Sequence, residues 1–186
     1  MIKVAIVGNI ASGKSEAEKI LIDKGYKVFD TDKMAHEILE SSSEILEAFK
    51  AYEILENGKI SRKKLGKLVF ETPELKQKLE AITHPLIKKR ITEIFSRYNS
   101  EKYVFISIPL LFEANMQELF DKILFIYCDD EIRLKRLMKR NNFTKEEAEQ
   151  RMHSQIAQDK KVNKCNYIIN NESTIENLKQ EIDKLF

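Results

Sequence analysis

The sequence predicts an α/β fold with a five-stranded parallel sheet. Five short apolar runs have the length of strands, and they lie at residues 2–7, 26–29, 103–108, 123–128 and 167–170. Segments with helical periodicity separate these runs, which is the order typical of a parallel sheet covered by helices. A glycine-rich loop joins the first run to the first helical segment. Because ligands of open α/β sheets lie beyond the carboxyl ends of the strands, we expect the functional site at that edge.

That loop, Gly8–Ser15, has the pattern G-x-x-x-x-G-K-S between a strand and a helix. Its glycines let the backbone turn sharply, and successive N–H groups then converge on an anion at a helix N-terminus. Lys14 is expected to reach the β- and γ-phosphates of a nucleotide, and the Ser15 hydroxyl to hold Mg²⁺. We therefore predict a nucleoside triphosphate site, with a chance match in an ordinary turn as the competing interpretation. The predicted contacts here are Gly8, Asn9, Ile10, Ala11, Ser12, Gly13, Lys14, Ser15 and Glu16.

Length and composition fit one globular domain. The 186 residues are 42% hydrophobic and 33% charged. The net charge of +2 argues neither for nor against nucleic acid, but a DNA-coating protein would show a stronger basic bias, so no nucleic-acid partner is expected. No apolar run approaches the roughly 20 residues that span a bilayer, and no targeting segment precedes the first strand. We therefore expect a cytoplasmic protein without a membrane partner or an obligate protein partner. Cys128 and Cys165 form no C-x-x-C pair and are expected to be free thiols.

Asp30 and Asp32 follow the second predicted strand. In a parallel sheet they would reach the same edge as the glycine-rich loop. One carboxylate would orient Mg²⁺ or its water ligands, and the other would accept a proton from an attacking hydroxyl. The competing interpretation is that either residue caps the next helix. For Asp30 alone, capping and chemistry are equally supported.

Residues 33–100 are predicted to be almost continuous helix with breaks. Asn57-Gly58 marks a turn, and His84-Pro85 is expected to interrupt the helix because proline disfavours helical geometry in the residue before it. Such a break would point His84 into a cleft, and a hydrogen-bonded histidine at a helix boundary is an equally supported interpretation. Residues 33–100 contain more helix than one crossover between two strands needs. We therefore predict a helical insertion that binds a second substrate.

The third strand, at 103–108, contains Ser107 and no acid, whereas many phosphate-loop enzymes have a magnesium-binding Asp on such a strand. The helix after the fourth strand presents Arg133, Arg136 and Arg140 on one face. This face is either a solvated stripe or a set of charges that neutralise a triphosphate and stack on adenine.

Two capping boxes are predicted, at Thr144–Glu147 and at Ser173–Glu176, each at the start of a helix. The first would begin the second helix of a short basic pair. Such a pair suits a mobile lid over the nucleotide.

Several motifs, taken in order, resemble the dephospho-CoA kinase family over nearly the whole chain. They are Gly8–Ser15, Asp30-Thr31-Asp32 with Ala35, Asn57–Leu65, Val69-Phe70, His84-Pro85, Pro109–Glu113, Arg136, Arg140, Arg151–Gln155 and Tyr167–Asn171. The resemblance implies a three-layer P-loop kinase fold. It also implies that ATP, with Mg²⁺, phosphorylates the ribose 3′-hydroxyl of dephospho-CoA to give coenzyme A and ADP.

The same resemblance implies roles for individual residues. Catalysis would use Asp32 as the base together with Lys14 and Arg140, and Arg136 and Arg140 would also bind ATP. Asp32, His84 and Leu111 would contact the substrate. The implied parts are a nucleotide-binding core (about 1–32, 101–138 and 159–186), a CoA-binding insertion (about 33–100) and a lid (about 139–158). The chain departs from the family where it has His36 in place of a frequent Arg, and Ser107 and Asn166 in place of a frequent Asp.

Two alternatives share the same phosphate loop. Another nucleoside or nucleotide kinase would have the same core and a different acceptor. A GTP-dependent switch protein would need a D-x-x-G element and an N-K-x-D element. The chain has no D-x-x-G, and Asn163-Lys164-Cys165-Asn166 ends in Asn instead of the Asp that reads guanine.

Overall fold

The computed structural model describes all 186 residues and divides them into two compact units. The first, which we call the sheet unit, comprises Met1–Phe29 and Tyr98–Phe186. The second, the helical unit, comprises Asp30–Arg97.

The sheet has five strands in the spatial order β2-β5-β1-β6-β7. Their bounds are β1 Ile2–Val7, β2 Lys27–Asp30, β5 Tyr103–Ser107, β6 Lys122–Tyr127 and β7 Tyr167–Asn170. Ile6 of β1 aligns in parallel with Ser107 of β5 on one side and with Leu124 of β6 on the other. The predicted α/β fold with a five-stranded parallel sheet is therefore confirmed.

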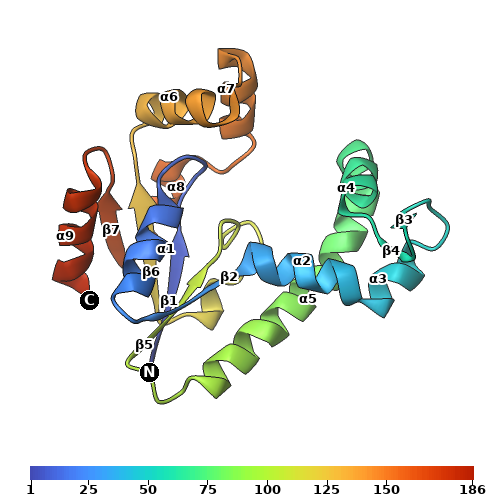
Figure 1. Ribbon diagram of the computed structural model, residues 1–186, viewed down its shortest axis with the longest axis horizontal. Coiled ribbons are helices and arrows are strands. Elements are labelled where there is room, and N and C mark those ends of the chain that lie inside the picture. The colour runs from blue at the N-terminus through green and yellow to red at the C-terminus, as the bar shows by residue number, and fades with distance from the viewer. The chain divides into compact units, whose positions relative to one another are not determined.

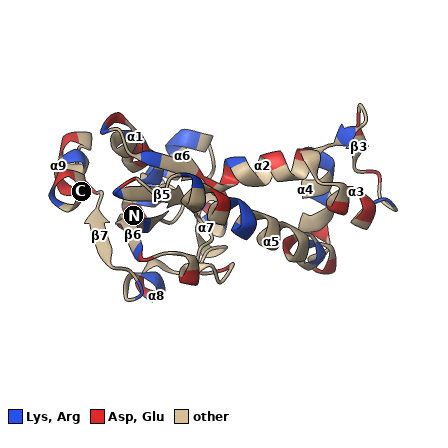
Figure 2. Cartoon of the chain, turned by 90° about the horizontal axis from the view of Figure 1, so that it is seen from below, with Lys and Arg blue, Asp and Glu red and all other residues tan.

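Helices α1 (Lys14–Asp23) and α9 (Ile175–Leu185) cover one face of this sheet, as Figure 1 shows. Alternate strand residues form the core beneath them because successive side chains of a strand point to opposite faces. This core consists of Val4, Ile6, Phe105, Leu124, Ile126 and Ile169 from the strands and Ala17, Ile20, Leu21, Leu178 and Ile182 from the helices. The strand residues of opposite phase, such as Ala5 and Phe125, have no exposed surface either. Burial on both faces explains the continuous apolar runs, and Figure 2 shows charged residues mainly on the helices.

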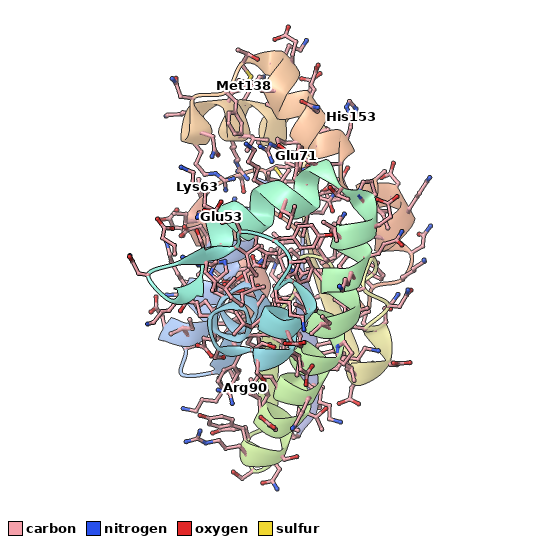
Figure 3. All side chains as sticks on the ribbon, turned by 90° about the vertical axis from the view of Figure 1, so that its right-hand side faces the viewer. Glu53, Lys63, Glu71, Arg90, Met138 and His153 are labelled. Carbon is pink, nitrogen blue, oxygen red and sulfur yellow. The ribbon has the colours of Figure 1, made fainter.

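The remaining helices of the sheet unit are a 3₁₀ turn at Gln117–Leu119, α6 (Asp130–Asn141), α7 (Lys145–His153) and α8 (Gln158–Val162). Helix α6 ends where Asn142 adopts φ 53°, a left-handed conformation that asparagine tolerates. Figure 3 labels Met138 on α6 and His153 at the end of α7.

One predicted capping box forms and the other does not. Thr144 accepts a hydrogen bond from the Glu147 N–H, and the Glu147 side chain accepts one from the Thr144 N–H. At the start of α9 the cap is Thr174, one residue later than predicted. The third helical position is therefore Asn177, so no box with Glu176 is possible.

The helical unit comprises α2 (Thr31–Ser41), α3 (Ser43–Ala48), α4 (Arg62–Glu71), α5 (Pro73–Arg97) and a two-stranded sheet. Its core consists of Ile45, Phe49, Ile54, Ile60 and Leu65. None of the helices in either unit combines the length and the apolar character that a membrane span requires.

One prediction for this unit is confirmed and one is wrong. Asn57-Gly58 forms the predicted turn, which closes an antiparallel hairpin of β3 (Leu55–Glu56) and β4 (Lys59–Ile60). Asn57 has φ 51° and Gly58 has φ 76°, the pair of positive φ angles typical of a hairpin turn that matches strand twist.

The predicted break at His84-Pro85 is absent, because α5 continues through Pro85 without interruption. Proline removes one helical hydrogen bond, since it has no N–H to donate. The buried residues on both sides of Pro85 compensate by packing along one face of the helix. They are Thr83, Ile87, Ile91, Ile94 and Phe95.

Candidate nucleotide-binding site

The phosphate loop connects β1 to α1 through two left-handed residues. Ala11 has φ 63° and Gly13 has φ 94°, and α1 begins at Lys14. A Cβ atom on Gly13 would lie 1.9 Å from Asn171 Nδ2, and one on Gly8 would lie 2.5 Å from Ser12 Oγ. Both positions therefore require glycine. Left-handed residues next to a helix N-terminus form the concave set of N–H groups that binds anions.

The segment after α7 holds the first half of the loop. Asn9 Nδ2 donates a hydrogen bond to the Ile156 carbonyl oxygen over 2.9 Å. The Ile10 N–H donates to Gln155 Oε1 over 2.8 Å. These bonds connect the loop to residues some 145 positions away in sequence, so the loop conformation depends on the end of the predicted lid segment.

Two further side chains hold the loop from the other elements of the sheet unit. Arg133 Nε donates to the Ile10 carbonyl oxygen over 2.9 Å, and Asn171 Nδ2 donates to the Ser12 carbonyl oxygen over 2.8 Å. Both side chains are buried. The loop is therefore fixed before any nucleotide binds, which reduces the entropy lost on binding.

Some polar atoms around the loop are buried without a protein partner. They are Asn9 Oδ1, Ser12 Oγ, Arg133 Nη2 and Gln158 Oε1. Buried polar atoms in native proteins are nearly always hydrogen-bonded, and exceptions point to a ligand, a water molecule or a functional strain. Two of the four belong to the loop itself.

The loop lysine contacts a carboxylate that no sequence motif indicated. Lys14 Nζ lies 2.7 Å from Glu18 Oε1, and both side chains are 14% exposed. Ser107 Oγ donates a hydrogen bond to the same Glu18 oxygen over 2.5 Å and also contacts Lys14 Nζ. Only the i, i+4 spacing of Lys14 and Glu18 could have suggested this pair. Ser15, the predicted metal ligand, is exposed at the first turn of α1.

The three arginines predicted on one face of α6 have different environments. Arg133 is 2% exposed, pairs with Asp130 at 2.6 Å and holds the loop, so it is a buried structural residue. Arg136 Nη1 contacts Cys128 Sγ at 3.4 Å. Burial raises the pKa of the Cys128 thiol, and Arg136 opposes that rise. Arg140 is exposed and donates to Asn141 Oδ1.

A pocket of about 180 Å³ lies beside the loop. It combines polar groups with an apolar wall, a composition typical of small-molecule sites. Its lining residues are Gly13, Glu16, Arg136, Asn171, Ser173, Ile175 and Leu178. The structure thus brings the predicted residues Glu16 and Arg136 together next to Gly13.

The candidate residues of the helical unit lie at the start of α2 and within α5. Asp30 caps α2 by accepting a hydrogen bond from the Asp32 N–H over 2.8 Å, as the capping interpretation predicted. Asp32 is an exposed residue in the first turn of that helix. His84 is half-buried within α5. Leu111, the remaining predicted substrate residue, is in the sheet unit and has no exposed surface.

A hollow of about 330 Å³ lies between α2 and α5 within the helical unit. It is lined by Met34, Glu37, Ile38, Ser41, Leu86, Lys89, Arg90 and Glu93. Figure 3 labels Arg90, whose guanidinium lies 3.5 Å from the Glu93 carboxylate.

Comparison with known proteins shows the family of this chain. The family model described as dephospho-CoA kinase matches residues 2–177. The chain belongs to the dephospho-CoA kinase family. A dephospho-CoA kinase from Listeria monocytogenes is 37% identical over 185 residues, which cover 96% of this chain and 92% of that protein. The relative from Oceanobacillus iheyensis is also 37% identical, with 98% and 94% coverage.

A solved dephospho-CoA kinase from Campylobacter jejuni has the same fold. It superposes with a TM-score of 0.78 and 35% identity, over 98% of this chain and 94% of that one. The dephospho-CoA kinase family contributes to coenzyme A synthesis by phosphorylating dephospho-CoA, so its members are nucleotide-binding phosphotransferases. Membership of this family supports the assignment of Gly8–Ser15 as a nucleotide-binding loop.

Proposed function

We propose that this protein transfers the γ-phosphoryl group of ATP to the ribose 3′-hydroxyl of dephospho-CoA, giving coenzyme A and ADP. One observation carries the proposal. A preorganised phosphate loop with Lys14 at its end is present in a chain of the dephospho-CoA kinase family. Phosphoryl transfer depends mainly on positioning and on stabilisation of negative charge, and such a loop supplies both.

On the donor side, the loop N–H groups and Lys14 would hold the β- and γ-phosphates. Arg136 borders the pocket beside Gly13, so its guanidinium would neutralise phosphate charge or stack on the adenine ring. Arg140 would act from the last turn of α6 as a mobile charge of the lid. Residues 139–158 would form that lid, because Gln155 and Ile156 connect its end directly to the loop.

The residues present at the loop fit Mg²⁺. Mg²⁺ prefers oxygen ligands and keeps several waters, and it rarely occupies a cage made only of protein groups. The Ser15 hydroxyl is an exposed oxygen at the start of α1, and no cluster of three or more His, Cys, Asp or Glu side chains could hold a metal by itself. Ser15 would therefore bind Mg²⁺ together with the nucleotide. When bound, the ion would neutralise charge between the phosphates.

On the acceptor side, Asp32 would take the proton of the attacking 3′-hydroxyl. An exposed carboxylate in the first turn of α2 is accessible to a substrate. The helical insertion, about residues 33–100, would bind the rest of dephospho-CoA, with His84 and Leu111 among its contacts.

An acceptor panel tests this function against its alternatives. Purified protein with ATP and Mg²⁺ is given dephospho-CoA, a nucleoside monophosphate or a nucleoside, and ADP release is followed with a coupled assay. Of the three acceptors, we expect only dephospho-CoA to give rapid ADP release. Preference for a nucleoside monophosphate would overturn the proposed acceptor, and tight GTP binding with rejection of ATP would favour a switch protein.

A further inference from the structure

We infer that Glu18 supplies the carboxylate of the magnesium site that β5 does not provide. The inference rests on the proposed function, because it concerns the ion that accompanies ATP. It assigns a positioning role to a residue of α1 that no motif includes. Three features of the sheet unit lead to it.

The first feature is the end of β5. In P-loop enzymes the ion is held by the loop Ser or Thr and by an Asp on a nearby strand. β5 pairs directly with β1, the strand that leads into the loop, and Ser107 aligns with Ile6. β5 ends at Ser107, and none of its five residues is acidic. The expected carboxylate must therefore come from elsewhere or be missing.

The second feature is the position of the Glu18 carboxylate. Its Oε1 atom accepts a hydrogen bond from Ser107 Oγ over 2.5 Å, so it occupies the space into which a longer acidic side chain at position 107 would extend. Glu18 also lies three residues after Ser15 in α1, and residues at that spacing share one helix face. The predicted metal-binding hydroxyl and this carboxylate are therefore on the same side of α1.

The third feature is charge. The Glu18 carboxylate is only 2.7 Å from Lys14 Nζ, and Lys14 is the residue expected to reach the phosphates. The single positive charge of Lys14 offsets the Glu18 carboxylate but not the several negative charges of a triphosphate as well, so a further cation is needed to reduce the repulsion between them. With Mg²⁺ bound, the same carboxylate becomes favourable, because it can accept hydrogen bonds from the metal-bound waters.

A role for Glu18 that is limited to holding Lys14 would affect nucleotide binding differently from a role in holding Mg²⁺. If Glu18 served only to hold Lys14 before the nucleotide arrives, its removal would free Lys14 and would tighten nucleotide binding equally with and without Mg²⁺. If Glu18 helps to hold Mg²⁺, its removal weakens only the gain in affinity that Mg²⁺ brings. The measured quantity is therefore the ratio of two dissociation constants.

The experiment titrates the full-length protein with adenosine 5′-(β,γ-imido)triphosphate in a calorimeter, once with Mg²⁺ and once with a chelator. The ratio of the two dissociation constants gives the magnesium gain, and the affinity of the free nucleotide for Mg²⁺ cancels between variants. We expect Glu18→Gln to lower this gain about tenfold, the lower end of the effect of losing an outer ligand. Glu18→Ala, the second variant, should lower it as well. Adding Ser107→Asp to Glu18→Ala, in which the space beside position 107 is vacant, should restore the gain.

The matched control is Asp23→Asn, which removes the same charge from the exposed far end of α1 and should leave the gain unchanged. An unchanged gain in both Glu18 variants would overturn the inference, as would a failure of Ser107→Asp to restore it. The proposed function has a separate test in the wild type. If wild-type protein showed no Mg²⁺-dependent turnover of dephospho-CoA, the proposed function itself would be wrong.

Discussion

The phosphate loop and the start of the helical unit contrast in how their key side chains are held. Asn9, Ile10 and Ser12 of the loop each form a hydrogen bond with a residue more than 120 positions away in sequence. In the helical unit, by contrast, Asp30 bonds the backbone only two residues away. The phosphate loop is thus fixed by the tertiary structure, whereas the cap that Asp30 forms on α2 is a local contact. A phosphate-binding site can therefore be inferred from the fold, whereas the identity of the acceptor is inferred from membership of the family.

Gly13→Ala should have the largest effect, because it disrupts the conformation of the phosphate loop. The new Cβ atom would displace Asn171 and would impose a left-handed conformation on alanine. We expect a loss of about 2–5 kcal/mol in the free energy of unfolding, from roughly 1–2 for the backbone and 1–3 for the buried hydrogen bond. Nucleotide binding should disappear in calorimetry. Retention of tight binding would show that the loop is not rigid.

Asp32→Asn should separate ATP binding at the loop from turnover of the acceptor. We expect ATP affinity to stay normal in a binding titration, while turnover of dephospho-CoA falls by about 10²–10⁴, the usual contribution of a general base. Glu44→Gln is the matched control, since Glu44 is also an exposed acid in the first turn of a helix. Near-normal turnover in Asp32→Asn would remove Asp32 from the role of base.

Lys14→Ala should lower turnover by about 10²–10³, the effect typical of losing one group that stabilises transition-state charge. Steady-state kinetics with saturating dephospho-CoA measure it. Lys19→Ala removes an exposed lysine from the same helix and should have little effect. An intact rate in Lys14→Ala would contradict the assignment of the whole donor site.

Gly66→Ala should have the smallest effect, and the opposite sign to Gly13→Ala. Gly66 lies inside α4, and a methyl group added there would meet no atom within 4 Å. Alanine is favoured over glycine in a helix by roughly 0.5–1 kcal/mol, so denaturant unfolding should show a modest gain in stability with unchanged kinetics. A loss of stability would indicate that α4 is packed more tightly than the structure shows.

The same contrast explains which features the sequence could predict. The five strands and the loop at Gly8–Ser15 follow from local patterns that depend on neighbouring residues alone. The contacts of Glu18 with Ser107 and of Asn171 with Ser12 join segments about 89 and 159 positions apart. No periodicity or motif records such pairs, because the tertiary fold brings them together.

Two sites in the helical unit differ in whether local propensity or packing decides the structure. Pro85 is an unfavourable residue for a helix interior, but the buried face of α5 outweighs the lost hydrogen bond. Asn57-Gly58 is a strong turn signal, yet its flanking strands are only two residues long and leave no alternating pattern. Propensity therefore predicted the turn at Asn57-Gly58 correctly, whereas packing decided the outcome at Pro85.

The most direct test of the proposed reaction is the position of the transferred phosphate. Protein, γ-labelled ATP, Mg²⁺ and dephospho-CoA are incubated, and the product is analysed by mass spectrometry and by phosphorus NMR. The proposed function predicts one added phosphoryl group, carrying the label, on the ribose 3′-hydroxyl, with one ADP formed for each coenzyme A. Label in inorganic phosphate alone, or on any other group of the acceptor, would contradict it.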